Sequence, residues 1–104
     1  MSAPYIVFSH GQDGEPWGAK IVAMAEVARA QGYAVESVDY RGMADPAVRV
    51  RRLLEVCKEL PGKLVLVGSS LGAHVCMTAA AHDRYFVVDG DETVVAIWPR
   101  VNGW

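Results

Sequence analysis

The sequence has no large excess of charge of either sign and no long apolar run. Its 104 residues include 10 Lys and Arg against 12 Asp and Glu, a formal net charge of -2. The charges are interspersed, so we expect neither a nucleic acid nor an anionic membrane as a partner. No apolar run approaches the roughly 18 residues of a membrane-spanning helix. The N-terminus has neither a basic start nor a cleavage site, so no signal peptide is expected.

Cysteine and the common cofactor motifs are also scarce or missing. Cys57 and Cys76 stand far apart, in no metal-binding or redox spacing. Because both fall on apolar helix faces, we interpret them as buried free thiols of a cytoplasmic protein. The chain contains neither G-x-G-x-x-G nor a P-loop lysine, so nucleotide binding ranks low. We therefore expect no metal site and no cofactor.

The composition indicates one globular domain over residues 1–104. Hydrophobic residues make up 52% and charged residues 21% of the chain. These proportions are typical of a folded protein with a single core. A chain of this length has room for one hydrophobic core.

Apolar segments alternate between strand and helix patterns along the chain. We expect strands at residues 4–9, 33–40, 64–67 and 84–88, and helices at 17–31, 46–59 and 73–81. This β-α alternation predicts an α/β fold with three α/β/α layers and a parallel sheet with right-handed crossovers. The first and third strands are the most apolar and should be central, whereas Glu36 and Ser37 place the second strand at an edge. The predicted strand order is 2-1-3-4.

Local signals predict where the helices begin and end. Pro16 suits the first turn of the first helix, and Gly32 is placed to end it. Asp45 is expected to cap the second helix, with Pro46 in its first position. The arginines of that helix, Arg49 among them, are expected mostly on its outer face.

The C-terminal segment allows two interpretations. Apolar runs flank Asp89-Gly90-Asp91-Glu92, which favours a hairpin that adds an antiparallel fifth strand at the edge. The alternative is a loop followed by an irregular segment whose Trp98 and Trp104 fold back over the sheet.

Gly68-Ser69-Ser70-Leu71-Gly72 fits the pattern G-x-S-x-G. It follows an apolar strand directly and precedes a helix, which is the context of a nucleophile elbow. A turn that tight forces the serine into a sparsely populated backbone conformation, and side chains at Gly68 or Gly72 would collide. The free N–H groups of the next helix would face an oxyanion formed there.

On these residues the chain resembles the α/β-hydrolase superfamily, in particular its small, lidless bacterial serine esterase-like members. The resemblance rests on residues 10–14, 39–42 and 68–72, each at the end of an expected strand, and covers residues 4 to about 82. Because the chain is short for a serine hydrolase, the resemblance implies a truncated α/β-hydrolase core. It implies that Ser70 is the nucleophile. It further implies that the backbone N–H groups of Leu71 and Gln12 form the oxyanion hole.

The acid and the base leave several candidates in this sequence. The family places an acid and then a histidine after the serine. Asp89 and Asp91 are candidates for the acid, although both also suit a turn. No histidine follows His82, so the base is sought among His10, His74, His82 and a histidine of another subunit.

Two functions follow. The first is a serine hydrolase of the carboxylesterase type that acts on a small ester. The second is a catalytically impaired or non-catalytic domain that forms a homodimer or higher homo-oligomer through its C-terminal edge.

Overall fold

The computed structural model describes residues 5–61, 64–80, 86–90 and 93–98. The first elements are β1 (Tyr5–Ser9), α1 (Ala19–Ala30), β2 (Ala34–Val38) and α2 (Pro46–Glu59). They are followed by β3 (Leu64–Ser69), α3 (Leu71–Ala80), β4 (Phe86–Gly90) and β5 (Thr93–Trp98).

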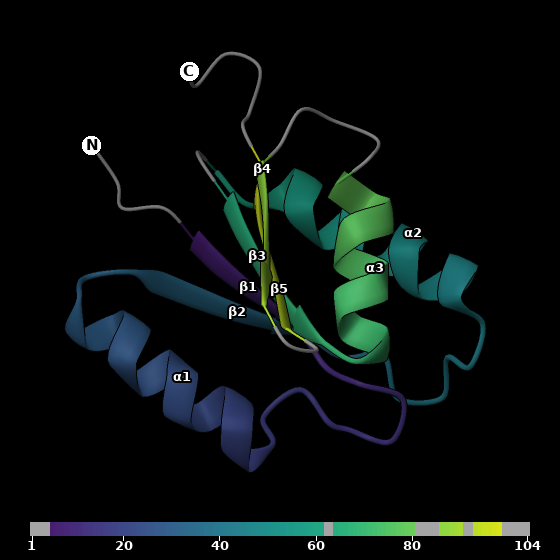
Figure 1. The fold of residues 1–104 in the computed structure, drawn as a ribbon, viewed down its shortest axis with the longest axis horizontal. Coiled ribbons are helices and arrows are strands. Elements are labelled where there is room, and N and C mark those ends of the chain that lie inside the picture. Colours follow the sequence, from purple (N-terminus) through teal and green to yellow (C-terminus); the bar gives the residue numbers. More distant parts are fainter. Residues whose placement is uncertain (1–4, 62–63, 81–85, 91–92, 99–104) are drawn as a thin grey trace.

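The elements form three layers, as predicted. Helix α1 lies on one face of the sheet, and α2 and α3 lie together on the other (Figure 1). Alternate residues of each central strand point to opposite layers, since Val7 packs with the α2–α3 side and Phe8 with α1. None of the helices in the described ranges is both long and apolar enough to span a bilayer.

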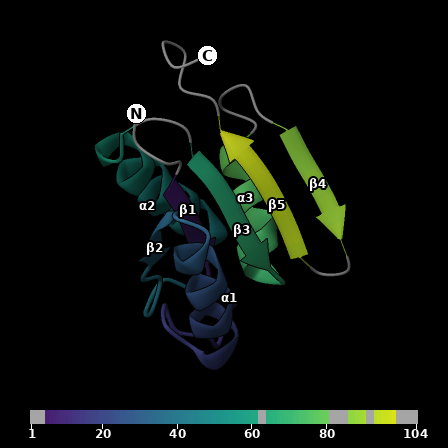
Figure 2. The ribbon, with the colours of Figure 1, turned by 90° about the vertical axis from the view of Figure 1, so that its left-hand side faces the viewer.

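The strand order is β2-β1-β3-β5-β4. Strands β2, β1 and β3 are parallel, with β2 at the edge, which confirms the 2-1-3 part of the prediction. The position of β4 next to β3 was wrong, because β5 lies between them and pairs antiparallel with both (Figure 2).

The predicted hairpin explains this difference. Strand β4 has the same direction as β3 but does not pair with it. The strand that follows in the chain, β5, occupies the place between them. The six residues of β5 pair with all of β3, from Leu64 opposite Trp98 to Ser69 opposite Thr93. The inner place gives this strongly apolar strand two hydrogen-bonded neighbours, so β4, not β5, is at the edge. Trp98 thus belongs to a strand, and Trp104 lies outside the described residues.

Two of the three expected helix boundaries are confirmed. The Asp45 carboxylate accepts a hydrogen bond from the Ala47 N–H at 2.9 Å, and Pro46 is the first helical residue. Gly32 has a φ of +90° directly after α1, which a residue with a side chain adopts only with strain.

The start of α1 was predicted too early. The helix begins at Ala19 after Gly18, and Pro16 precedes it in a turn. The Pro16 carbonyl instead accepts a hydrogen bond from the Ser37 hydroxyl, which ties this turn to β2.

Arg49 was also placed incorrectly. We expected it on the outer face of α2, but Arg49 is only 2% exposed in the first turn of that helix. The two cysteines are buried free thiols, as expected.

Candidate functional site

Ser70 joins β3 to α3 in a strained conformation. Its φ is 56°, in the left-handed region that residues with side chains rarely adopt, and the residue is exposed. Its carbonyl accepts from the N–H groups of Ala73 at 3.0 Å and His74 at 3.3 Å, so helical bonding begins at once. The N–H groups of Leu71 and Gly72 precede these bonds, so they have no intrahelical acceptor and are available to a ligand.

Close backbone approach explains the two glycines around Ser70. A Cβ atom at Gly68 would overlap the carbonyl oxygen of Gly72 and lie 2.5 Å from its carbonyl carbon. A Cβ atom at Gly72 would overlap the Ser9 carbonyl oxygen and lie 2.9 Å from that of His10. The first turn of α3 therefore rests directly against the end of β1, where the loop with Gln12 begins.

The loop after β1 is organised around the Gly11 carbonyl. Its oxygen accepts from the Gly14 N–H at 3.2 Å, from His10 Nδ1 at 2.8 Å and from Arg49 Nη1 at 3.2 Å. The two halves of a trans peptide point in opposite directions, so these bonds also fix the direction of the Gln12 N–H. This N–H is the second oxyanion donor that the resemblance implies.

Both ring nitrogens of His10 are engaged. The residue is 4% exposed, and Nε2 accepts from the Tyr40 N–H at 2.9 Å. Because a backbone N–H can only donate, Nδ1 carries the proton that is donated to the Gly11 carbonyl. No ring lone pair is left to take a proton from Ser70, so the geometry makes His10 a part of the loop.

Arg49 also belongs to this site, although the sequence did not lead us to expect it there. Its Nε donates to the Met43 carbonyl at 2.7 Å, its Nη1 to the carbonyls of His10 and Gly11, and its Nη2 to that of Gln12. The signal was present, since Arg49 is four residues before buried Leu53 and so shares its apolar face.

Tyr40 fills the space between these groups. Its hydroxyl and that of Ser9 are 2.6 Å apart, and its ring lies 5.1 Å from that of His10 and 5.2 Å from the Arg49 guanidinium carbon. Burial raises the pKa of Tyr40 well above its usual range, so the phenol stays neutral. The charge of Arg49 therefore has no phenolate counterion at neutral pH.

The next two residues close the turn after β2. Arg41 donates to the Asp39 carboxylate from Nε at 2.9 Å and from Nη2 at 2.8 Å, which holds the pKa of Asp39 well below its usual range. Gly42 follows with a φ of +84°. This exposed pair orders the segment that carries Tyr40.

The other candidate residues are only partly placed. His74 is exposed on α3. Asp89 lies in β4 opposite Val94, which itself pairs with Gly68, so its backbone is level with the elbow but two strands away from it. His82 and Asp91 lie outside the described residues. Within the described ranges, no imidazole hydrogen-bonds to Ser70, and no group of acidic, histidine or cysteine side chains could hold a metal ion.

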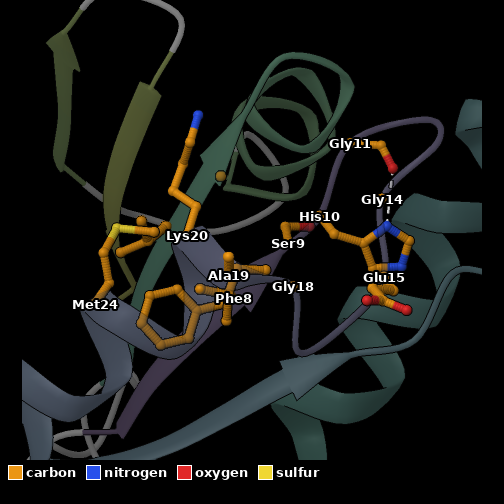
Figure 3. A pocket seen from close by; sticks show the side chains of 13 residues that line it. Phe8, Ser9, His10, Gly11, Gly14, Glu15, Gly18, Ala19, Lys20 and Met24 are labelled. Atoms are coloured by element: carbon orange, nitrogen blue, oxygen red, sulfur yellow. Dashed lines mark hydrogen bonds between the residues drawn. The ribbon is translucent and has the colours of Figure 1, made fainter.

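A cleft of about 210 Å³ borders this region on the α1 side. Its apolar lining includes Phe8, Met24 and Val67, and it reaches Gly11 of the β1 loop and Gly68 of the elbow. Figure 3 shows Met24 beside the Phe8 ring, with the His10 ring turned away from both. The cleft can take a small apolar group next to the elbow.

Comparison with known proteins supports the resemblance. A family model described as the alpha/beta hydrolase family matches residues 6–103. The quorum-quenching protein AidA of Acinetobacter baumannii (strain MDR-ZJ06) is 31% identical over 106 aligned positions. That alignment covers 85% of this chain and 34% of AidA, so the chain spans about a third of the length of this relative. No solved structure matched significantly. The chain belongs to the alpha/beta hydrolase family.

Proposed function

We propose that this chain is a serine hydrolase of the carboxylesterase type, in which Ser70 attacks the carbonyl carbon of a small ester. The observation that carries the proposal is the conformation of Ser70. An exposed serine held at a φ of 56° between a strand and a helix is strained, and such strain persists where the surrounding structure enforces it. Membership of a hydrolase family supports the same reading.

The reaction would use two backbone donors. A general base would take the proton of Ser70 Oγ as this oxygen bonds to the ester carbon, and the negative charge would pass to the former carbonyl oxygen. The N–H groups of Leu71 and Gln12 would stabilise that oxyanion. The base would then give the proton to the departing alkoxide, so that the alcohol leaves, and water activated by the same base would release the acid from the acyl-enzyme. The cleft beside Gly68 fits the apolar part of a small substrate.

The base must be a group other than His10, because the ring of His10 is fully engaged. His74, His82 and a histidine of another subunit remain the candidates. Asp89 and Asp91 are the candidates for the carboxylate that would orient it.

Labelling with a fluorophosphonate probe tests the nucleophile. We expect the wild type to be labelled and Ser70→Ala to be unlabelled. Ser69→Ala is the matched control, because it removes the neighbouring hydroxyl and leaves G-x-S-x-G intact. Labelling that persists in Ser70→Ala, or a wild type that is not labelled at all, would refute the proposal. His74→Ala and His82→Ala, labelled under the same conditions, would identify a base within the chain.

A second candidate function is assembly through the sheet edge. Strand β4 pairs only with β5 within the described residues, so its other side has backbone groups available to another strand. A homodimer formed there would give a mass of twice 11.3 kDa by light scattering. A monomer over a wide concentration range would contradict it.

A further inference from the structure

Arg49 is a buried cation whose hydrogen bonds go to backbone carbonyls. The residue is 2% exposed, and within the described residues no carboxylate pairs with it. Burial of a charge is costly unless hydrogen bonds compensate it. Four carbonyl oxygens do so here, at 2.7 to 3.3 Å from the guanidinium nitrogens.

The position of these carbonyls in the chain is informative. Those of His10, Gly11 and Gln12 are consecutive, and they form the loop beside the elbow. All peptides within the described ranges are trans, so each N–H that follows one of these carbonyls points away from Arg49. The guanidinium thus lies on the carbonyl side of the loop and the N–H groups on the opposite side.

We propose that Arg49 is a positioning residue for the oxyanion hole. It holds the peptide between Gly11 and Gln12 so that the Gln12 N–H is fixed before substrate arrives. Its positive charge, which no carboxylate neutralises within the described residues, lies behind that peptide and also favours a negative charge in front of it. This inference rests on the proposed hydrolase function, because the oxyanion forms only in that reaction.

The planar guanidinium suits this task better than an ammonium group would. Its five N–H donors have a fixed arrangement, and three different nitrogens bond to four oxygens here. A lysine at this position would keep the charge but could not reproduce the arrangement. The two contributions, geometry and charge, can therefore be separated by substitution.

Steady-state hydrolysis of a short activated ester, p-nitrophenyl acetate, by the whole chain tests the inference. For Arg49→Met we expect kcat to fall about 100-fold with KM changed less than about twofold, since only transition-state binding is lost. For Arg49→Lys, which retains the charge, we expect a loss of about 10-fold. Arg51→Met is the matched control, because it removes an exposed arginine from the same helix and should leave kcat unchanged.

A loss of activity caused by unfolding must be distinguished from a loss caused by a displaced loop. Each variant is therefore assayed well below its own thermal midpoint, and Arg49→Lys decides the question if Arg49→Met does not fold. A folded Arg49→Lys with wild-type kcat, or a loss confined to KM, would overturn the inference and leave the proposed function intact.

The activity of the wild type distinguishes failure of this inference from failure of the proposed function. If the wild type neither hydrolyses the ester nor reacts with a fluorophosphonate, the proposed function fails, and the inference fails with it as a statement about catalysis. The amide resonances of Gly11 and Gln12 would then show whether Arg49 still orders the loop. Unchanged resonances in Arg49→Lys would exclude that role as well.

Discussion

Single residues in this site are constrained by how closely two backbones approach. Gly72 meets the carbonyls of Ser9 and His10 at distances that leave no room for a methyl group. Gly32 is different, because its φ of +90° is strained for other residues but a Cβ there would meet nothing within 4 Å. Substitutions at these two glycines therefore distinguish the cost of a steric clash from the cost of a left-handed backbone conformation.

We therefore expect Gly72→Ala to cost on the order of 3 kcal/mol or more, since the end of β1 or the first turn of α3 must move. Gly32→Ala should cost only about 1–2 kcal/mol, the strain of a left-handed residue. Urea denaturation of both variants measures the difference. Equal losses would show that α3 does not press on β1 as described.

The buried phenol and thiol predict a response to alkali. Burial raises the pKa of Cys76 from 9.0 to about 12 and also raises that of Tyr40. Both groups hold their proton more tightly in the folded state, so their contribution is fully present below the unfolded pKa and is lost as pH rises above it. We expect the free energy of unfolding to fall from about pH 9 upward, with a slope approaching about 1.4 kcal/mol per pH unit for each group.

Denaturant unfolding between pH 8 and pH 11 checks this prediction. In Cys76→Ala, the decrease in the free energy of unfolding that begins near pH 9 should disappear. In Tyr40→Phe, the further decrease that begins near pH 10 should disappear. A wild type whose stability is flat over this interval would contradict the burial of both groups.

Among the elements, α2 connects stability to the candidate site. Its first turn carries the Asp45 cap and, four residues later, Arg49. The cap satisfies the Ala47 N–H and holds the turn from which Arg49 reaches the β1 loop. A helix that frayed here would release the loop as well.

We expect Asp45→Ala to lower the free energy of unfolding by about 1 kcal/mol, because an N-cap hydrogen bond is lost. Glu55→Ala on the exposed side of the same helix should change it by less than about 0.5 kcal/mol, since its contact with Arg52 is an exposed ion pair at 3.9 Å. Thermal or urea unfolding measures both. A larger loss in Glu55→Ala than in Asp45→Ala would contradict the assigned cap.

At the scale of the whole molecule, the sheet brings the site together. Strands β1 and β3 are parallel neighbours, so the loop after β1 and the elbow after β3 meet at the carboxyl ends of these two strands. Each of these strands has a hydrogen-bonded neighbour on both sides, whereas β2 and β4 have one each within the described residues.

This arrangement predicts the pattern of amide hydrogen exchange. The amides of Val7 and Leu66, both fully buried in central strands, should exchange slowest. Those of β2 that point away from β1 should exchange at least about 10-fold faster. Native-state exchange followed by NMR measures these rates, and equal protection across the sheet would contradict the strand order.

Much of the fold could be predicted because it depends on local patterns. The apolar strands, the Asp45 cap, Gly32 at the end of α1 and the parallel 2-1-3 core all follow from residues close in the chain. The strain at Ser70 was foreseeable for the same reason, since G-x-S-x-G between a strand and a helix is a local signature. The family resemblance rests on these same segments.

The errors were made where partners distant in sequence decide the outcome. Strand β5 took the place next to β3 because two apolar neighbours were available there, and the order of two similar apolar strands cannot be read from either one. Arg49 was expected at the surface because arginines usually are, whereas the structure buries it against carbonyls some 37 to 39 residues away. By itself, the sequence determined the elements and the strained serine. Only the tertiary structure decided that His10 is fully engaged and that Arg49 supports the loop, because both depend on hydrogen bonds to distant backbone groups that no local pattern encodes.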